Sequence, residues 1–440
     1  MTGKERLLKG IILGTVAIVI LTAVAVVALP RLNRGMTGYG KDALYLVEMI
    51  ERVHPIFIMD GYLPDNYYAV RDEFLAMARN TTCRREFIFG AYRYATMLRD
   101  GHMAGPAMLW FAPMRDGRFV GVYWEIQNGK LMLVDENGTT NMEVVKIGGA
   151  PIAQIFSVID TYIYAENEVD RLWNYAFYAR YDKIIERAGG EFGDNWAILT
   201  LSNNGEWSTM EVELICFTTF VGSFLVMGTE FIVRYEILDN DIFFIDLRHF
   251  QMDESINQTV RSIEQARNSG IRNFIVDLRG NGGGSSMVGQ VLLEAMGIYR
   301  LPSFGAIRRF SPLAAEMRHG RNFPSEGYSV SRPNPRGPDF TNTFVTILTD
   351  KNTYSSATMM ATWVQDGNFG NIIGAPSRNA PSAFGDVLFF SLPYTGLGVS
   401  VSYVRWLRPD ANADQYTLWP DIMVDPADAL EVAIEYLRNR

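Results

Sequence analysis

Two loops carry residue types that could do chemistry, and each follows an apolar stretch and opens a helical one. Residues 277–284 read DLRGNGGG, with four glycines in five positions. Such a backbone can approach a ligand closely and aim its N–H groups at an anion. The glycine spacing fits neither a phosphate loop nor a dinucleotide-binding loop, and no lysine follows it. Taken alone, the loop could also be an ordinary strand-to-helix turn.

The second loop, residues 353–358, reads TYSSAT and precedes a helical stretch. A serine at a helix N-terminus gains from the helix dipole and the free N–H groups, which stabilise developing negative charge. Serine in that place is also the commonest helix N-cap. Taken alone, this loop reads as a helix cap, and only the presence of both loops in one chain favours a catalytic role.

The two loops resemble motifs of the tail-specific (C-terminal processing) serine protease family. Residues 277–284 are similar to the family's DLRxNxGG motif, and residues 355–374 are similar to its nucleophile helix and following strand. The resemblance covers residues 40–440, is strong over 240–375 and loose over 116–225. It implies an α/β fold with a ClpP/crotonase-like sandwich core and a PDZ-like module. Further stretches that fit are 148–152, 243–250 and 419–422.

The resemblance favours Ser355 over Ser356 as the nucleophile. The family helix carries Gln-Asp ten and eleven residues after its serine, and Gln365 and Asp366 stand at that spacing from Ser355. Counted from Ser356, the same Gln-Asp pair misses the family spacing by one residue. The family's glutamate three residues after the nucleophile is Thr358 in this chain, which is a departure from the pattern.

The general base must differ from that of many family members, which use a Ser/Lys dyad. The family spacing ends at Ala380, and no lysine follows Lys351. His102, in the run Asp-Gly-His at 100–102, resembles an element of the tricorn-like branch, in which a histidine before the PDZ-like domain is the base. His249, after an apolar strand, is the second candidate. The two remaining histidines read as structural or exposed: His54 and His319.

A third group should hold the tautomer of the imidazole. In the tricorn-like branch an acid precedes the final Pro-Asp, which points here to Asp414, six residues before Pro420. Asp386 is an alternative. The expected oxyanion donors are the N–H groups of Gly283 or Gly284, together with that of the nucleophile itself.

The bulk composition narrows the function classes. The net charge of −9 argues against a nucleic-acid partner, because phosphate binding needs a basic surface. The two cysteines, Cys83 and Cys216, cannot define a disulfide framework or a zinc site on their own. No metal-ligand spacing such as His-x-x-x-His occurs, so we expect no metal and no cofactor.

The N-terminus predicts a membrane anchor. Lys4, Arg6 and Lys9 precede an uncharged stretch, residues 10–29, which as a helix would be about 30 Å long and match a bilayer core. The positive flank favours a cytoplasmic N-terminus with the rest of the chain outside. Cleavage near 23–25 is the alternative, and it too would export the chain.

Periodicity divides the chain after the anchor at 1–35 into a helical region at 36–115, a strand-rich region at 116–225 and an α/β region at 226–440. The resemblance implies that residues 116–225 are a PDZ-like module and residues 226–440 the serine protease core. The core opens with a βαβ unit, and residues 302–338 form a long Pro/Gly/Arg-rich connection. The expected function is that of a membrane-anchored, extracytoplasmic serine endopeptidase acting on protein or peptide substrates. The alternative is a membrane-tethered, catalytically impaired peptide-binding pseudoprotease.

Overall fold

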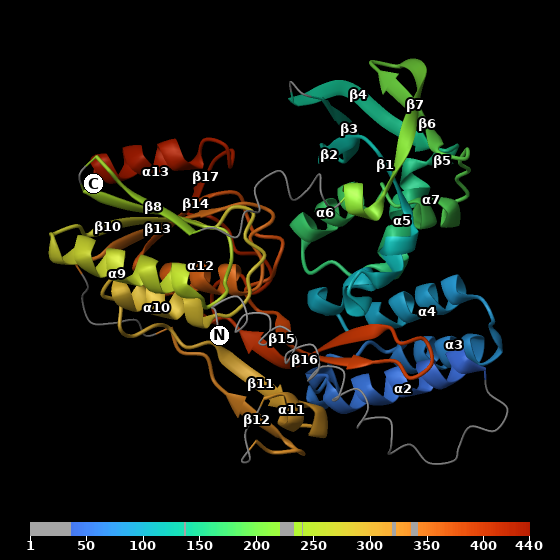
Figure 1. Ribbon diagram of the computed structural model, residues 1–440, viewed down its shortest axis with the longest axis horizontal. Helices are drawn as coiled ribbons and strands as arrows, with labels where there is room; N and C mark the ends of the chain where they lie inside the picture. Colours follow the sequence, from blue (N-terminus) through green and yellow to red (C-terminus); the bar gives the residue numbers. More distant parts are fainter. Residues whose placement is uncertain (1–36, 136–137, 221–232, 240, 319–322, 336–341) are drawn as a thin grey trace, which may run out of the picture.

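The computed structural model describes residues 37–135, 138–220, 233–239, 241–318, 323–335 and 342–440. Within these ranges the chain has a mixed α/β fold, with an N-terminal group of helices and three β-sheets (Figure 1). The expected anchor helix at 10–29 lies outside the described residues. Among the helices that are described, none combines the length and the apolar character needed to cross a bilayer.

The N-terminal helices form where the apolar spacing predicts them. α2 (Gly38–Val53) begins at a Thr37 cap and buries Ala43, Val47 and Ile50 on one face. It ends before Pro55, since a residue that precedes proline disfavours the helical conformation. Two helices complete the group, α3 (Tyr67–Asn80) and α4 (Arg84–Thr96).

A seven-stranded sheet follows, mostly antiparallel and with the order β1-β7-β6-β4-β3-β2, β5 pairing with β4. Its strands are β1 (Arg118–Val120), β2 (Tyr123–Gln127), β3 (Lys130–Asp135), β4 (Gly138–Ile147), β5 (Ala150–Pro151), β6 (Trp196–Asn203) and β7 (Glu206–Cys216). Three helices lie between β5 and β6 in the sequence: α5 (Ile152–Tyr162), α6 (Glu168–Tyr178) and α7 (Asp182–Arg187).

A six-stranded sheet, ordered β17-β14-β13-β10-β9-β8, forms the second half. Five of its strands pair in parallel: β9 (Ile242–Leu247), β10 (Asn273–Asp277), β13 (Phe344–Thr349), β14 (Gly370–Gly374) and β17 (Ile422–Met423). The remaining strand, β8 (Val233–Leu238), is antiparallel to β9. One face packs on α9 (Glu254–Asn268), α10 (Met287–Ala295) and α12 (Ser356–Asp366), and the other on α13 (Ala429–Arg438) (Figure 1). Both faces are therefore covered, as parallel sheets require.

A third, antiparallel sheet occupies residues in which we expected a long connection. Residues 302–338 include β11 (Gly305–Arg309), α11 (Pro312–Met317) and β12 (Tyr328–Ser331). β11 pairs with β12 on one side and with β16 (Gly398–Leu407) on the other, and β16 also pairs with β15 (Phe384–Ser391). Apolar residues of β15 and β16 share one hydrophobic core with the N-terminal helices. The range 226–440 therefore contributes to three hydrophobic cores. β11, β15 and β16 pack with the N-terminal half, and the six-stranded sheet has a core on each of its faces (Figure 1).

Candidate active site

The two loops meet because their strands are neighbours. β10 and β13 run parallel with Asp277 beside Leu348, so the loop after each strand leaves the same edge of the sheet. The loops are joined directly: the Tyr354 N–H donates to the Asn281 carbonyl at 2.9 Å, and the Ser356 hydroxyl donates to the Gly284 carbonyl at 2.6 Å. The glycine-rich loop is therefore fixed against the serine loop.

The polar residues of DLRGNGGG hold the loop in shape. Asp277 is buried and pairs with Arg279 at 2.6 Å. The Asn281 amide donates to the Leu247 carbonyl at 2.6 Å, and its oxygen accepts the Gly283 N–H at 2.9 Å. These contacts explain why the motif needs its Asp, Arg and Asn although none of them has to touch a substrate.

Ser355 stands at the start of α12 in a conformation that serine rarely adopts. Its φ of 54° and ψ of −121° lie in the left-handed half of the map, and its side chain makes no capping hydrogen bond. Such strain costs on the order of 1–3 kcal/mol and persists only where the surroundings enforce it. Ser356, by contrast, is buried and its hydroxyl is occupied by the Gly284 carbonyl. Of the two serines, Ser355 has the hydroxyl that is available for chemistry.

His102 lies against Ser355 although 253 residues separate them in the sequence. The imidazole Nε2 is 3.2 Å from the Ser355 Oγ. His102 belongs to a short 3-10 helix, η3 (Gly101–Met103), which Asp100 caps by accepting the His102 N–H at 2.8 Å. The His102 side chain is 17% exposed, so a substrate can reach it.

Burial sets the protonation of His102. It lowers the pKa of the imidazole below its ordinary value, while the Asp100 carboxylate, 3.8 Å from Nδ1, opposes that shift. A neutral imidazole with a free Nε2 lone pair is the form that can accept a proton from a serine hydroxyl. The pair Ser355–His102 has the geometry of a nucleophile and its base.

Asp414 is not brought to His102, which corrects the prediction of the third residue. Its Oδ1 accepts the N–H groups of Tyr416 and Thr417, and its Oδ2 accepts the Trp419 indole N–H at 2.9 Å. Both oxygens are thus used within a local turn. Asp414 was placed by counting back from Pro420 through a loop, where spacing does not fix geometry.

The other sequence candidates also lie elsewhere or are engaged. Asp386 lines the cavity beside Ser355 but pairs with Arg318. His249 is 3.8 Å from Asp253 at the start of α9. His319 lies outside the described residues.

Two of the expected oxyanion donors already have partners. The Gly283 N–H donates to the Asn281 side chain, and the Ser355 N–H donates to the Asn379 Oδ1 at 2.7 Å. A substrate oxyanion would have to displace these acceptors. Gly284 lines the cavity together with Ser355 and Ser356, so the backbone there has the better access to a substrate carbonyl.

Comparison with known proteins now places the chain. Residues 241–424, which include both loops, match the model of peptidase family S41. The chain therefore carries a peptidase family S41 domain at residues 241–424. It is therefore a serine peptidase. No curated protein matches it by sequence.

Two structures of mature CPAF support the fold of this serine peptidase. Mature CPAF complexed with lactacystin is 13% identical, with 91% of this chain and 97% of that chain covered and a TM-score of 0.60. A second structure of mature CPAF is 14% identical, with coverage of 91% and 95% and a TM-score of 0.57. A photosystem II D1 C-terminal processing protease is 14% identical, with coverage of 89% and 94% and a TM-score of 0.47.

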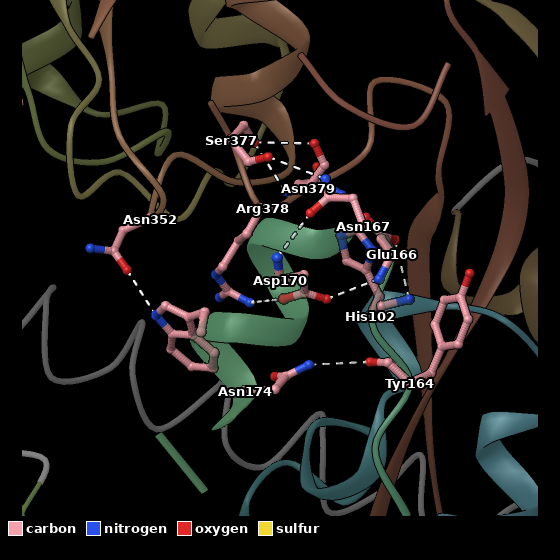
Figure 2. A network of polar contacts seen from close by, with 12 residues as sticks. His102, Tyr164, Glu166, Asn167, Asp170, Asn174, Asn352, Ser377, Arg378 and Asn379 are labelled. Atoms are coloured by element: carbon pink, nitrogen blue, oxygen red, sulfur yellow. Dashed lines mark hydrogen bonds and ion pairs between the residues drawn. The ribbon is translucent and has the colours of Figure 1, made fainter. Parts of the chain in front are cut away.

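Behind Ser355 the peptidase has a buried polar network that the sequence did not reveal (Figure 2). The Glu166 Oε2 accepts the Asn379 amide N–H at 2.6 Å and the Ala380 N–H at 2.8 Å. Burial, reinforced by the nearby Asp170 carboxylate, raises the pKa of Glu166 to about 7. Asn379 and Ala380 occupy the place where Ser/Lys members carry their lysine. The absence of a lysine at Ala380 was therefore the feature of the sequence that could have directed attention to this segment.

The same network ties α6 to the serine loop (Figure 2). Arg378 is held between the rings of Trp173, at 4.0 Å, and Tyr354, at 4.4 Å, and it pairs with Asp170 at 3.1 Å. The Trp173 indole N–H donates to the Asn352 side chain at 3.0 Å. α6 and the serine loop thus support one another.

A cavity of about 530 Å³ opens beside Ser355 and His102. Its apolar walls come from the serine helix and the third sheet: Phe304, Met359, Ala383, Phe384, Val387 and Trp406. Among the described residues, Asp100, His102 and Glu166 bring possible metal-ligand atoms within 4.8 Å of one another. The two carboxylates already accept backbone N–H groups, at His102 and Gly101, so holding the histidine loop explains the cluster.

Proposed function

We propose that this peptidase is an endopeptidase in which Ser355 is the nucleophile and His102 the general base. The observation that carries the proposal is the 3.2 Å contact between His102 Nε2 and Ser355 Oγ. His102 takes the hydroxyl proton while Oγ bonds to the scissile carbonyl carbon. It then gives that proton to the leaving amine as the C–N bond breaks. Water hydrolyses the acyl-enzyme by the same route.

The apolar cavity supports substrates that enter as extended peptide segments. Aromatic and aliphatic walls next to the nucleophile favour an apolar side chain beside the scissile bond. We assign residues 116–225 as a PDZ-like module that would present such segments. Its support is the strand-rich sheet with α5 after the glycine pair at 148–149.

We further propose that residues 10–29 anchor the protein in a membrane with residues 41–440 outside the cytoplasm. The uncharged stretch after a basic flank supports this assignment. Protease added to intact cells should then degrade the large domain. Full protection of that domain, with degradation after lysis, would reject the topology.

Labelling with a fluorophosphonate probe tests the nucleophile directly. The wild-type protein and a Ser356→Ala variant should label, whereas Ser355→Ala should not, and hydrolysis of an unfolded protein should follow the same order. The alternative of a catalytically impaired pseudoprotease finds no support in the family match. A wild-type protein that neither labels nor cleaves would revive it.

A further inference from the structure

A second histidine lies buried behind the site, and its hydrogen bonds fix its tautomer. His54 ends α2 and caps the 3-10 helix η2 (Pro55–Ile58), where its Nδ1 accepts the Ile56 N–H at 3.2 Å. A neutral imidazole carries one N–H, so the proton must be on Nε2. That Nε2 is 3.1 Å from the Asp100 Oδ2. His54 is therefore a donor to Asp100.

Asp100 is bound on both sides. Its Oδ2 accepts from His54, and its Oδ1 accepts the His102 N–H at 2.8 Å while lying 3.8 Å from the His102 Nδ1. The side chains of His54 and Asp100 are fully buried. A carboxylate held by two donors at opposite oxygens cannot turn. Its negative charge therefore stays next to the His102 ring.

The charges around the pair agree with a neutral donor and an ionised acceptor. Burial lowers the pKa of His54, against the pull of Asp100, and the cations Arg309 and Arg405 lower it further. Burial alone would raise the pKa of Asp100, but the hydrogen bond from His54 holds it below its ordinary value. Asp100 therefore stays a carboxylate at neutral pH.

Around the His102 ring, further groups act on its charge. Arg378 lowers the pKa of His102, and Asp170 and the Phe384 carbonyl raise it. Asp100, however, is the carboxylate that stands at the Nδ1 side.

We infer that His54 is a positioning residue of the peptidase: its Nε2–H fixes Asp100, and Asp100 orients His102 and faces the positive charge that forms on it. The inference rests on the proposed roles of Ser355 and His102. When the Ser355 proton moves to His102 Nε2, the ring becomes an imidazolium whose Nδ1 lies 3.8 Å from the Asp100 Oδ1, within ion-pair distance. The pairing stabilises the charged state more than the neutral one, so it lowers the barrier to proton transfer.

Two amide substitutions separate this role from a merely structural one. Gln at position 54 can place its amide N–H where the ring carries Nε2–H, but it loses the cap on Ile56. Asn can keep the cap, because its short side chain ends where the ring carries Nδ1, but it cannot reach Asp100. Each variant therefore preserves one of the two hydrogen bonds of His54.

The measurement is kcat and KM of the full chain on a fluorogenic peptide. His54→Gln should keep kcat within about 3-fold, whereas His54→Asn should lower it about 10- to 100-fold at unchanged KM, part of the roughly 10²–10⁴ that a positioned base contributes. If His54→Asn has the higher kcat, the cap on Ile56 is what matters. If the two variants have equal kcat values, His54 acts only through packing or has no role in catalysis. Either result overturns the inference.

Asp100→Asn gives an independent readout. Removing the negative charge beside His102 should move the acid limb of the kcat/KM profile to lower pH, a shift that loss of packing would not produce. An unmoved limb overturns the role of Asp100. If the variant does not fold, the two His54 variants decide. Retained activity in Ser355→Ala would instead reject the proposed function, whatever the His54 variants do.

Discussion

A methyl group at Gly283 should damage catalysis much more than stability. An added Cβ would lie 2.7 Å from the Tyr354 carbonyl oxygen and 2.8 Å from both the Ser355 Cβ and the Ser356 nitrogen. Those contacts are about 0.7 Å shorter than the roughly 3.5 Å at which non-bonded heavy atoms pack. Because the atoms it meets are backbone and the nucleophile's own Cβ, the serine loop itself has to shift.

The two costs can be estimated separately. Gly283 has a φ of +90°, and a side chain in left-handed conformations costs about 1–2 kcal/mol. Misplacing a reacting group by about 1 Å can cost about 10²-fold in rate, and losing an oxyanion donor about 10²–10³. We therefore expect Gly283→Ala to lose about 10²-fold or more in kcat and only about 1–3 kcal/mol in the free energy of unfolding.

The neighbouring glycine provides the control. An added Cβ at Gly282 would meet nothing within 4 Å, and its φ is not in the left-handed region. Gly282→Ala should therefore leave both quantities nearly unchanged. Peptide hydrolysis and urea unfolding of the two variants make the comparison. A folded Gly283→Ala protein with wild-type kcat would refute the steric reasoning.

Three further predictions follow from the same contacts. Ser355→Ala and His102→Ala should each abolish nearly all peptide hydrolysis, and the double variant should be little worse than either; additive losses would mean that the two residues act separately. The acid limb of kcat/KM should have its midpoint below about 6.5, since burial lowers the pKa of His102 and activity needs its neutral form; a midpoint above 6.5 would contradict this base. Arg408→Leu should lower the free energy of unfolding by about 3–5 kcal/mol in urea titrations, because it leaves the buried Asp366 carboxylate without its 2.7 Å partner; a change below about 1 kcal/mol would show that Asp366 is solvated.

The parts of the site that local pattern fixes could be predicted from the sequence. The two loops follow apolar strands that become neighbours, and Gln365 and Asp366 fix the serine helix through Arg408. The Asp-Gly-His run singled out His102 because it resembles an element of the tricorn-like branch and because no lysine stands at the family position. Ser355 and His102 were expected to meet, and the structure places them 3.2 Å apart.

What depends on long-range packing could not be predicted. Glu166 and Asn379 are 213 residues apart, and nothing local marks either of them as a partner of the serine loop. His54 was interpreted as structural because the residue that follows it, Pro55, gives no indication of the contact between His54 and Asp100. The third sheet escaped notice since β11 and β12 are short, and β11, which pairs with β12, finds its other partner in β16, about 100 residues away.

The order of the residues along the chain sets when activity can appear during synthesis. His102 is made early, Ser355 follows 253 residues later, and η3 packs on β15 and β16, of which β16 ends at Leu407. At roughly 5–20 residues per second, about 15–60 s pass between the base and the end of that strand. Premature termination before β16 therefore yields an inert product rather than an unregulated protease, because the base would lack the strands on which it packs.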